Sequence, residues 1–172
     1  MRIAVVTSWL AVLCAAAPAS AERFVSPGFS IAFGSRGWSF GVEVSAGTLS
    51  SQAPVVVGVV AGFEVSPFAN SGEPWGRLYG EVELVTLFAG IGVGPAFLLG
   101  DNAETSVQLT PFLAIPAALV TDSRAQCKEP FPFVVPYYRF TSSSRSSAFH
   151  DVGVFGKFVY PMNGKRDECN FQ

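Results

Sequence analysis

The chain has 172 residues, of which 49% are apolar and 14% are charged. This balance excludes a disordered tail, and the scarcity of Lys and Glu excludes a long coiled coil. With 11 Lys and Arg against 13 Asp and Glu, the chain has no basic surplus for binding nucleic acid. One histidine and three cysteines leave little material for a transition-metal site, so we expect neither a metal nor a cofactor.

Residues 1–21 have the features of a cleaved secretory signal peptide. Arg2 gives a positive start, residues 3–17 carry no charge, and Ala19 and Ala21 occupy the small-residue positions that a signal peptidase reads. The uncharged run is short for a membrane helix. Leu13 precedes Cys14 where a lipidation signal needs a small residue. We therefore expect an exported protein, folded over residues 22–162 and ending in a polar tail at 163–172.

Beyond the signal peptide, apolar residues alternate with polar or small ones in short runs. A period of two predicts β-strands, and the segment 34–37, bounded by glycines, predicts a tight turn between the first two. The runs are 29–33, 38–44, 55–65, 78–84, 89–97, 107–119, 131–140 and 149–160. We predict an all-β fold, an antiparallel up-and-down barrel of about eight strands.

A helical alternative comes from the stretch 84–100, which contains no charged residue. Its length is close to the minimum for a membrane helix. Its several glycines and Pro95 disfavour a helix. A pair of strands joined by a turn near residues 86–89 fits this stretch better.

Charged residues in the predicted strands lie on the face opposite to the apolar one, and both signs occur. In a narrow barrel such charges form a buried network. Water-soluble sandwiches also alternate, so the period alone leaves open which face points inward. The interior charges that we expect are Glu43, Glu64, Glu81, Glu83, Arg139, Asp151 and Lys157.

Several aromatic residues lie near the ends of predicted strands, where membrane proteins carry interfacial belts. An ordinary aromatic core is the alternative. The belt residues that we expect are Trp38, Trp75, Tyr79, Tyr137, Tyr138 and Tyr160.

Two cysteines, Cys127 and Cys169, follow the signal peptide, and an even pair in an exported chain predicts a disulfide. A strand count from a periplasmic start places the connections 34–37, 66–76, 99–105 and 141–147 at the outer end. The connections 46–54, 86–89 and 121–130 and the tail then lie at the inner end. Both cysteines therefore belong to the inner end, as a disulfide between them requires.

This pattern resembles the small outer-membrane β-barrel proteins of Gram-negative bacteria, such as the eight-stranded membrane domain of OmpA and OmpX. The resemblance covers the signal peptide and nearly all of the chain that follows, without a diagnostic motif. It implies an outer-membrane location, contact with outer-membrane lipid and a structural or surface-interaction role. The sequence departs from the family where Gln172 follows the aromatic Phe171, and where the outer connections are no longer than the inner ones.

Two other functions remain open from the sequence. A soluble periplasmic or secreted barrel would turn the same apolar face inward around a small apolar ligand. A lipid-modifying acyl hydrolase would depend on His150, the single histidine. His150 and Asp151 point to opposite faces of a strand, and Val152 stands where the His-x-Ser arrangement of such hydrolases needs serine. We therefore expect no enzymatic activity, and the sequence names no protein or ligand partner.

Overall fold

The computed structural model describes residues 22–49, 55–70, 72–86, 88–100, 103–117, 130–143 and 148–162. All the regular structure in these ranges is β-strand apart from one residue, Ala117, in a 3₁₀ turn. The strands are β1 (Glu22–Gly34), β2 (Gly37–Leu49), β3 (Val55–Ala69), β4 (Trp75–Thr86), β5 (Ala89–Leu99), β6 (Glu104–Leu113), β7 (Ile115–Pro116), β8 (Phe131–Ser143) and β9 (Phe149–Pro161).

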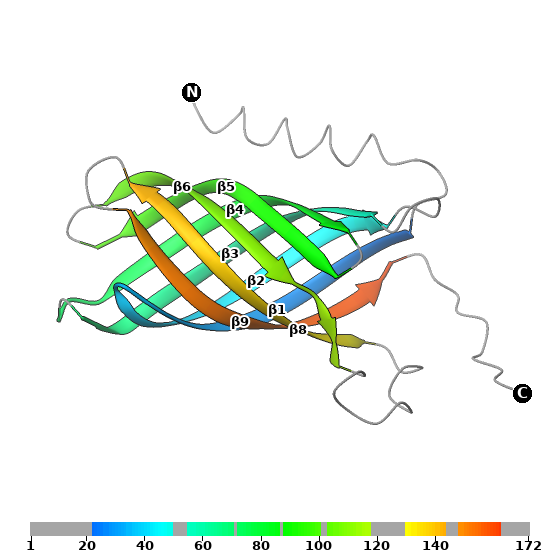
Figure 1. Ribbon diagram of the computed structural model, residues 1–172, viewed down its shortest axis with the longest axis horizontal. Coiled ribbons are helices and arrows are strands. Elements are labelled where there is room, and N and C mark those ends of the chain that lie inside the picture. Colours follow the sequence, from blue (N-terminus) through cyan, green and yellow to red (C-terminus); the bar gives the residue numbers. More distant parts are fainter. Residues whose placement is uncertain are drawn as a thin grey trace, which may run out of the picture.

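These strands form one closed antiparallel barrel. Their order around the wall is β6-β5-β4-β3-β2-β1-β9-β8-β7, and β6 also pairs with β8 to complete the circle. The two-residue β7 continues β6 after a break at Ala114, so β6 and β7 together count as one of the eight strands of the wall. Figure 1 shows the long strands running obliquely along the barrel. The predicted fold class is confirmed.

The alternation in the sequence becomes an alternation of faces in the structure. In β2, Trp38, Phe40 and Val42 are exposed, whereas Ser39 and Glu43 are buried. Successive side chains of a strand point to opposite sides, so each strand contributes one row to the exterior and one to the lumen.

The strands begin and end at two opposite ends of the barrel. The hairpin end carries the turn at Ser35 and Arg36, the ends of β3, β5 and β8, and the starts of β4, β6 and β9. The terminal end carries the starts of β1, β3, β5 and β8 and the ends of β2, β4, β7 and β9. Gly37 closes the first turn with a φ of 104°, a backbone conformation that glycine adopts without strain.

Several sequence-based expectations fall outside the described residues. The signal peptide, the polar tail at 163–172, and Cys127 and Cys169 with their disulfide all lie there. In the ranges that the structure does describe, no helix is long and apolar enough to cross a membrane. The stretch 84–100, for which a helix was the alternative, contributes the end of β4 and all of β5.

Candidate functional site: the charged lumen

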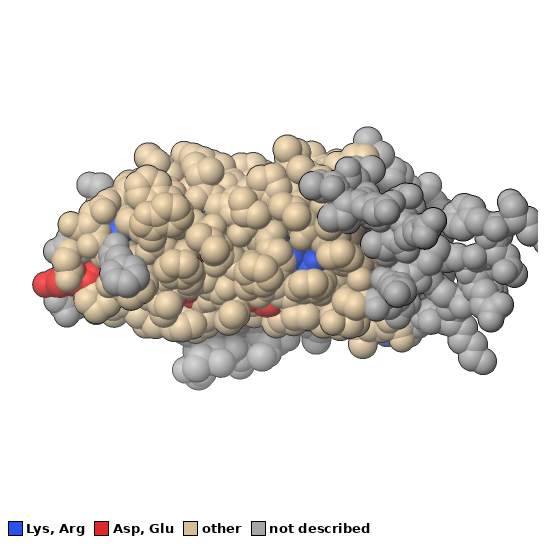
Figure 2. Space-filling model, turned by 90° about the horizontal axis from the view of Figure 1, so that it is seen from below, with Lys and Arg blue, Asp and Glu red and all other residues tan. Residues whose placement is uncertain are grey.

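The barrel buries charge and exposes apolar side chains. Glu64, Arg77 and Arg139 are 0% exposed, whereas Val42 is 62% and Val152 is 63% exposed. Figure 2 shows one side of the molecule, with few charged atoms among the described residues of its wall. On the exterior face of the described strands, Arg23 is the only Lys, Arg, Asp or Glu. The lumen is therefore the polar part of the described barrel, and it is the candidate functional site.

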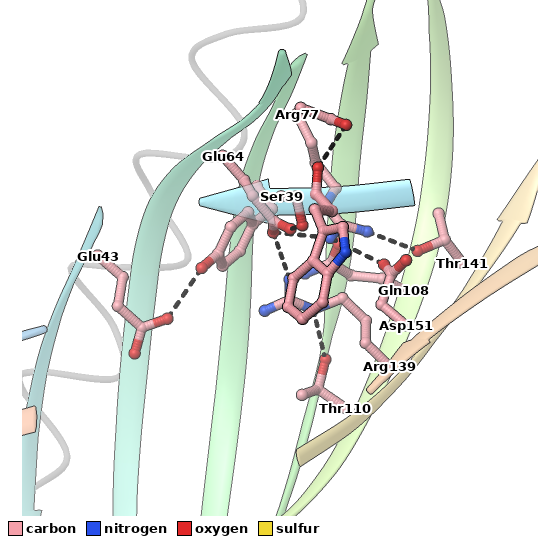
Figure 3. A network of polar contacts seen from close by, with 12 residues as sticks. Ser39, Glu43, Glu64, Arg77, Gln108, Thr110, Arg139, Thr141 and Asp151 are labelled. Carbon is pink, nitrogen blue, oxygen red and sulfur yellow. Dashed lines mark hydrogen bonds and ion pairs between the residues drawn. The ribbon is translucent and has the colours of Figure 1, made fainter. Parts of the chain in front are cut away.

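An outer charge layer, nearer the hairpin end, consists of Glu64, Arg77, Arg139 and Asp151. Arg77 Nη2 lies 2.7 Å from Glu64 Oε2 and 3.0 Å from Asp151 Oδ2. Arg139 Nη1 lies 2.8 Å from the same Glu64 oxygen. Ser39 also donates a hydrogen bond to Glu64, and Figure 3 shows how these groups converge from several strands. Two carboxylates face two guanidinium groups, so this layer is electrically balanced.

Arg139 connects the outer charge layer to the middle of the lumen. Its Cζ atom lies 4.6 Å from the ring centre of Tyr79 and 4.8 Å from that of Tyr137. These distances suit cation–π contact with both rings. Its Nε also donates to Thr110 Oγ1 over 3.3 Å. The guanidinium is thus held by an ion pair, a hydroxyl and two aromatic faces.

Glu81 occupies the middle of the lumen, and no cation of the described residues lies at ion-pair distance from it. It accepts hydrogen bonds from Gln108 Nε2 over 2.7 Å and from Thr110 Oγ1 over 2.5 Å. Both donors belong to β6, on the far side of β5 from Glu81. A side chain on Gly92 would crowd Glu81, since a Cβ there would lie 2.6 Å from Oε2.

An inner charge layer surrounds Lys157, nearer the terminal end. Its Nζ lies 2.7 Å from Glu43 Oε1 and 3.3 Å from Glu83 Oε1, and it donates to Ser45 Oγ over 3.2 Å. Tyr79 donates to the other Glu43 oxygen over 2.9 Å. This layer has one cation for two carboxylates. The two layers meet at Tyr79, whose ring contacts Arg139 and whose hydroxyl contacts Glu43.

Large side chains close the lumen around these layers. At the hairpin end, the rings of Trp75 and Phe149 lie 6.1 Å apart, and both Arg36 and Arg77 lie close to both rings. Nearer the terminal end, an apolar cluster fills the barrel. Its buried members are Ala32, Phe112, Val135, Tyr137 and Phe155, with Val85 and Phe133 packed against them. The lumen is a packed interior of side chains and not an open channel.

The predicted interior charges occupy the lumen in the structure. Six are at most 8% exposed, namely Glu43, Glu64, Glu81, Arg139, Asp151 and Lys157. The side chain of Glu83 is 12% exposed. Glu81 and Glu83 lie on the same face of β4 but have different partners, Gln108 and Thr110 for the first and Lys157 for the second.

The structure divides the aromatic residues expected in the belt into an exterior group and a lumen group. Trp38, Tyr138 and Tyr160 lie on the exterior, each at least 40% exposed. Tyr79 and Tyr137 are 3% exposed and point into the lumen, where they stack on Arg139. Trp75 also faces inward, against Phe149. The expectation for these three residues is wrong because it used only their position along a strand. It ignored that they lie on the same strand faces as the interior charges.

Sequence reasoning missed Arg77, which forms ion pairs with both carboxylates of the outer charge layer. A signal for it was present, because Arg77, Tyr79, Glu81 and Glu83 follow one another at intervals of two in β4. Residues with this spacing share a face. Placing Glu81 inside therefore also places Arg77 and Tyr79 inside.

His150 lies outside the lumen. It is exposed on β9, and its ring stacks on Tyr138 with 6.1 Å between the ring centres. Asp151, next in the chain, points inward to Arg77. The two residues therefore form no catalytic pair. Among the described residues, no group of three or more His, Cys, Asp and Glu side chains is arranged to hold a metal ion.

Comparison with known proteins shows a likeness of fold without a likeness of sequence. No protein-family model and no curated protein matches the chain. The crystal structure of Neisserial surface protein A (NspA) is 10% identical and superposes with a TM-score of 0.51, covering 79% of this chain and 96% of that one. Ail, the attachment invasion locus protein of Yersinia pestis, solved with the heparin analogue sucrose octasulfate, is 11% identical with a TM-score of 0.41. That match covers 81% of this chain and 99% of Ail. The likeness to NspA, together with the closed wall of eight strands, shows that the chain has the fold of the small eight-stranded outer-membrane β-barrel proteins.

Proposed function

We propose that this protein is embedded in the outer membrane of a Gram-negative bacterium, where it has a structural or surface-interaction role. The observation that carries the proposal is the apolar exterior. Phe29, Trp38, Val107 and Leu113 are each more than half exposed, and exposed large apolar side chains occur on every strand except the two-residue β7. A soluble monomer rarely exposes contiguous apolar area on this scale. Lipid hydrocarbon is the solvent that such a surface needs.

The dimensions of the barrel fit a bilayer. Apart from the two-residue β7, the strands have 10 to 15 residues. About 9–11 tilted residues suffice to cross the hydrocarbon core. The charged Arg23 lies near the terminal end and His150 near the hairpin end, so the strand residues between them form an apolar belt around the wall.

A closed wall also satisfies the backbone. Inside a bilayer, unpaired N–H and C=O groups are costly, and a closed barrel leaves no edge strand. The pairing of β6 with β8 provides this closure. With export led by the expected signal peptide, the terminal end faces the periplasm and the hairpin end faces outward. The short connections of the hairpin end are then the parts available to external partners.

Three observations support this role over an apolar-ligand carrier, a wide pore and an acyl hydrolase. A barrel that binds an apolar ligand in water would have its apolar face inside, whereas here charged residues fill the lumen. A wide pore is incompatible with the packed lumen. For an acyl hydrolase, His150 lacks a carboxylate partner in the described structure, because Asp151 pairs with Arg77. We propose a barrel without enzymatic activity.

Electrophoresis of isolated outer membranes tests the proposal. Membranes would be dissolved in detergent without reductant, and samples left unheated would be compared with boiled ones. We expect the protein in the outer-membrane fraction, with a folded band whose mobility changes on boiling. Recovery in the soluble periplasmic or secreted fraction, without a heat-dependent shift, would contradict membrane insertion.

A further inference from the structure

The wall of the barrel is least continuous where β6 meets β8. These strands pair from Ser106–Ser143 to Leu109–Phe140, and then only at Phe112–Tyr137. Pairing resumes between β7 and β8 at Ile115–Val134 and Pro116–Phe133. By contrast, β1 and β2 pair without a gap from Glu22–Leu49 to Gly34–Gly37. The β1–β9 and β4–β5 pairs each have a single gap, after Val25–Tyr160 and after Tyr79–Ala96, whereas the seam along β8 has two.

Both gaps in this seam contain a proline. The register places Thr110 opposite Arg139 and Pro111 opposite Tyr138 in the first gap, and Leu113 opposite Pro136 in the second. Proline has no N–H to donate and is rare in central strands. Missing ladder bonds are costly in lipid because no water replaces them. The seam therefore needs other contacts to stay closed.

A side-chain hydrogen bond crosses the seam inside the first gap. Arg139 Nε donates to Thr110 Oγ1 over 3.3 Å, at a position where the backbone pair is missing. Below it, Phe112 of β6 packs with Val135 and Tyr137 of β8 in the apolar cluster. Side chains thus join the two strands where the backbone does not.

Both edges of the seam are also tied to one strand pair elsewhere in the wall, β3–β4. The β6 edge is held at Glu81 of β4, which accepts from Gln108 and Thr110. The β8 edge is held at Glu64 of β3, which accepts from Arg139 over 2.8 Å.

A second tie runs from Arg77 of β4 to Thr141 of β8, over 3.1 Å. Glu64 and Arg77 are register partners in the β3–β4 pair and form an ion pair with each other. The ties therefore converge on a single, continuously paired part of the wall, and Figure 3 shows several of them crossing the lumen.

We infer that a network of lumen side chains holds the barrel closed, and that the wall opens sideways at the β6–β8 seam when this network is weakened. The network consists of Glu64, Arg77, Glu81, Thr110 and Arg139. Opening would bring the apolar cluster behind the seam into contact with lipid.

Hydrogen exchange of the full-length barrel in lipid nanodiscs tests this inference. Glu81→Gln removes the charge that holds β6, and hydrogen bonds to charged groups are the stronger ones. We expect backbone amides of β6 and β8 to exchange about tenfold faster, because local opening governs exchange. Amides of β1 and β2 should be unchanged.

The matched control is Glu83→Gln, on the same face of β4. Glu83 contacts Lys157 of β9 and neither edge of the seam, so this variant should leave exchange in β6 and β8 as in the wild type. The inference is overturned if Glu83→Gln loosens the seam as much as Glu81→Gln does, or if the faster exchange appears at β1–β9 or uniformly around the wall.

Thr110→Val and an engineered lock keep the inference testable if Glu81→Gln does not fold. Thr110→Val preserves shape and removes the hydroxyl that contacts both Arg139 and Glu81. A disulfide between Val107→Cys and Ser142→Cys, a paired exterior position, should return exchange in β6 and β8 of Thr110→Val to the wild-type rate. Cys127 and Cys169 would be serine in all arms.

The control lock joins Ile31→Cys to Val154→Cys across β1 and β9, and it should not restore slow exchange. Equal rescue by both locks, or no rescue by the seam lock, would overturn the inference.

Discussion

The two faces of this barrel wall are made by the same strands and have opposite chemistry. In β2, Phe40 and Val42 point outward and are 42% and 62% exposed, while Ser39 and Glu43 point inward and are 1% and 7% exposed. A soluble sandwich shows the same period with the burial reversed. The two-residue alternation therefore identifies a strand, whereas the solvent around the protein, lipid or water, decides which face of the strand is buried.

Removal of a lumen cation should produce the largest effect. Arg77→Met leaves Glu64 and Asp151 with one fewer cation in a site that is almost fully buried. An uncompensated buried charge costs about 3–5 kcal/mol. We expect a loss of that order in the free energy of unfolding, measured with urea in lipid vesicles.

The control for this variant is Arg23→Met, an exposed arginine near the start of β1. It should change stability by less than about 0.5 kcal/mol. If both arginine variants cost the same, the lumen network would not stabilise the barrel.

A charge placed on the exterior should have the next largest effect. Val42→Arg introduces a guanidinium in the middle of β2, on the face that we assign to lipid. Such a change costs about 2–4 kcal/mol near the bilayer midplane and about 0–1 kcal/mol near the interface. Thr48→Arg, near the end of the same strand and on the same face, provides the interfacial comparison. A neutral result for Val42→Arg in vesicles would argue against lipid contact there.

Adding a methyl group at Gly62, beneath the ring of Tyr79, should have a moderate effect on the free energy of unfolding. A Cβ on Gly62 would collide with the Tyr79 ring, whereas one on Gly80 would approach nothing closer than 3.6 Å. Overpacking costs about 1–3 kcal/mol, so Gly62→Ala should be destabilising by that amount in the urea measurement. Gly80→Ala should be neutral or slightly stabilising. Equal effects would mean that Tyr79 does not rest on Gly62.

Replacement of His150 should have the smallest effect. His150→Gln removes an exposed ring whose contact is Tyr138, and exposed substitutions usually change stability by less than about 0.5 kcal/mol. Lipid composition of the outer membrane should also be unchanged, measured by mass spectrometry of extracted lipid. An altered acyl-chain pattern would instead point to a histidine-dependent enzyme.

The sequence was sufficient for the fold class and for the faces of most strands, because both depend on a local period of two. The sequence was insufficient to place Trp75, Tyr79 and Tyr137 in the lumen. The space for these large rings depends on small residues of neighbouring strands. Gly153, for example, lies directly beneath Tyr137. Such cross-strand complementarity depends on register, which a single strand does not carry.

The end of β6 shows the same limit. The run 107–119 predicted one strand, whereas the structure breaks it at Ala114, whose N–H donates to Phe88 O over 2.7 Å.

The pairing of each lumen carboxylate with its cation could not be predicted from the sequence either. Glu64 of β3 meets Arg139 of β8 across the lumen, and the stagger of the closed barrel sets that contact.

Spin labels on the exterior test the central claim most directly. Single cysteines would replace Val42, Val93 and Val154, which lie in β2, β5 and β9, with the native cysteines changed to serine. In vesicles, we predict that all three labels collide with lipid-soluble oxygen and are shielded from a water-soluble nickel chelate. Frequent collisions with the chelate at these positions would contradict the account, because they would place water where it requires lipid.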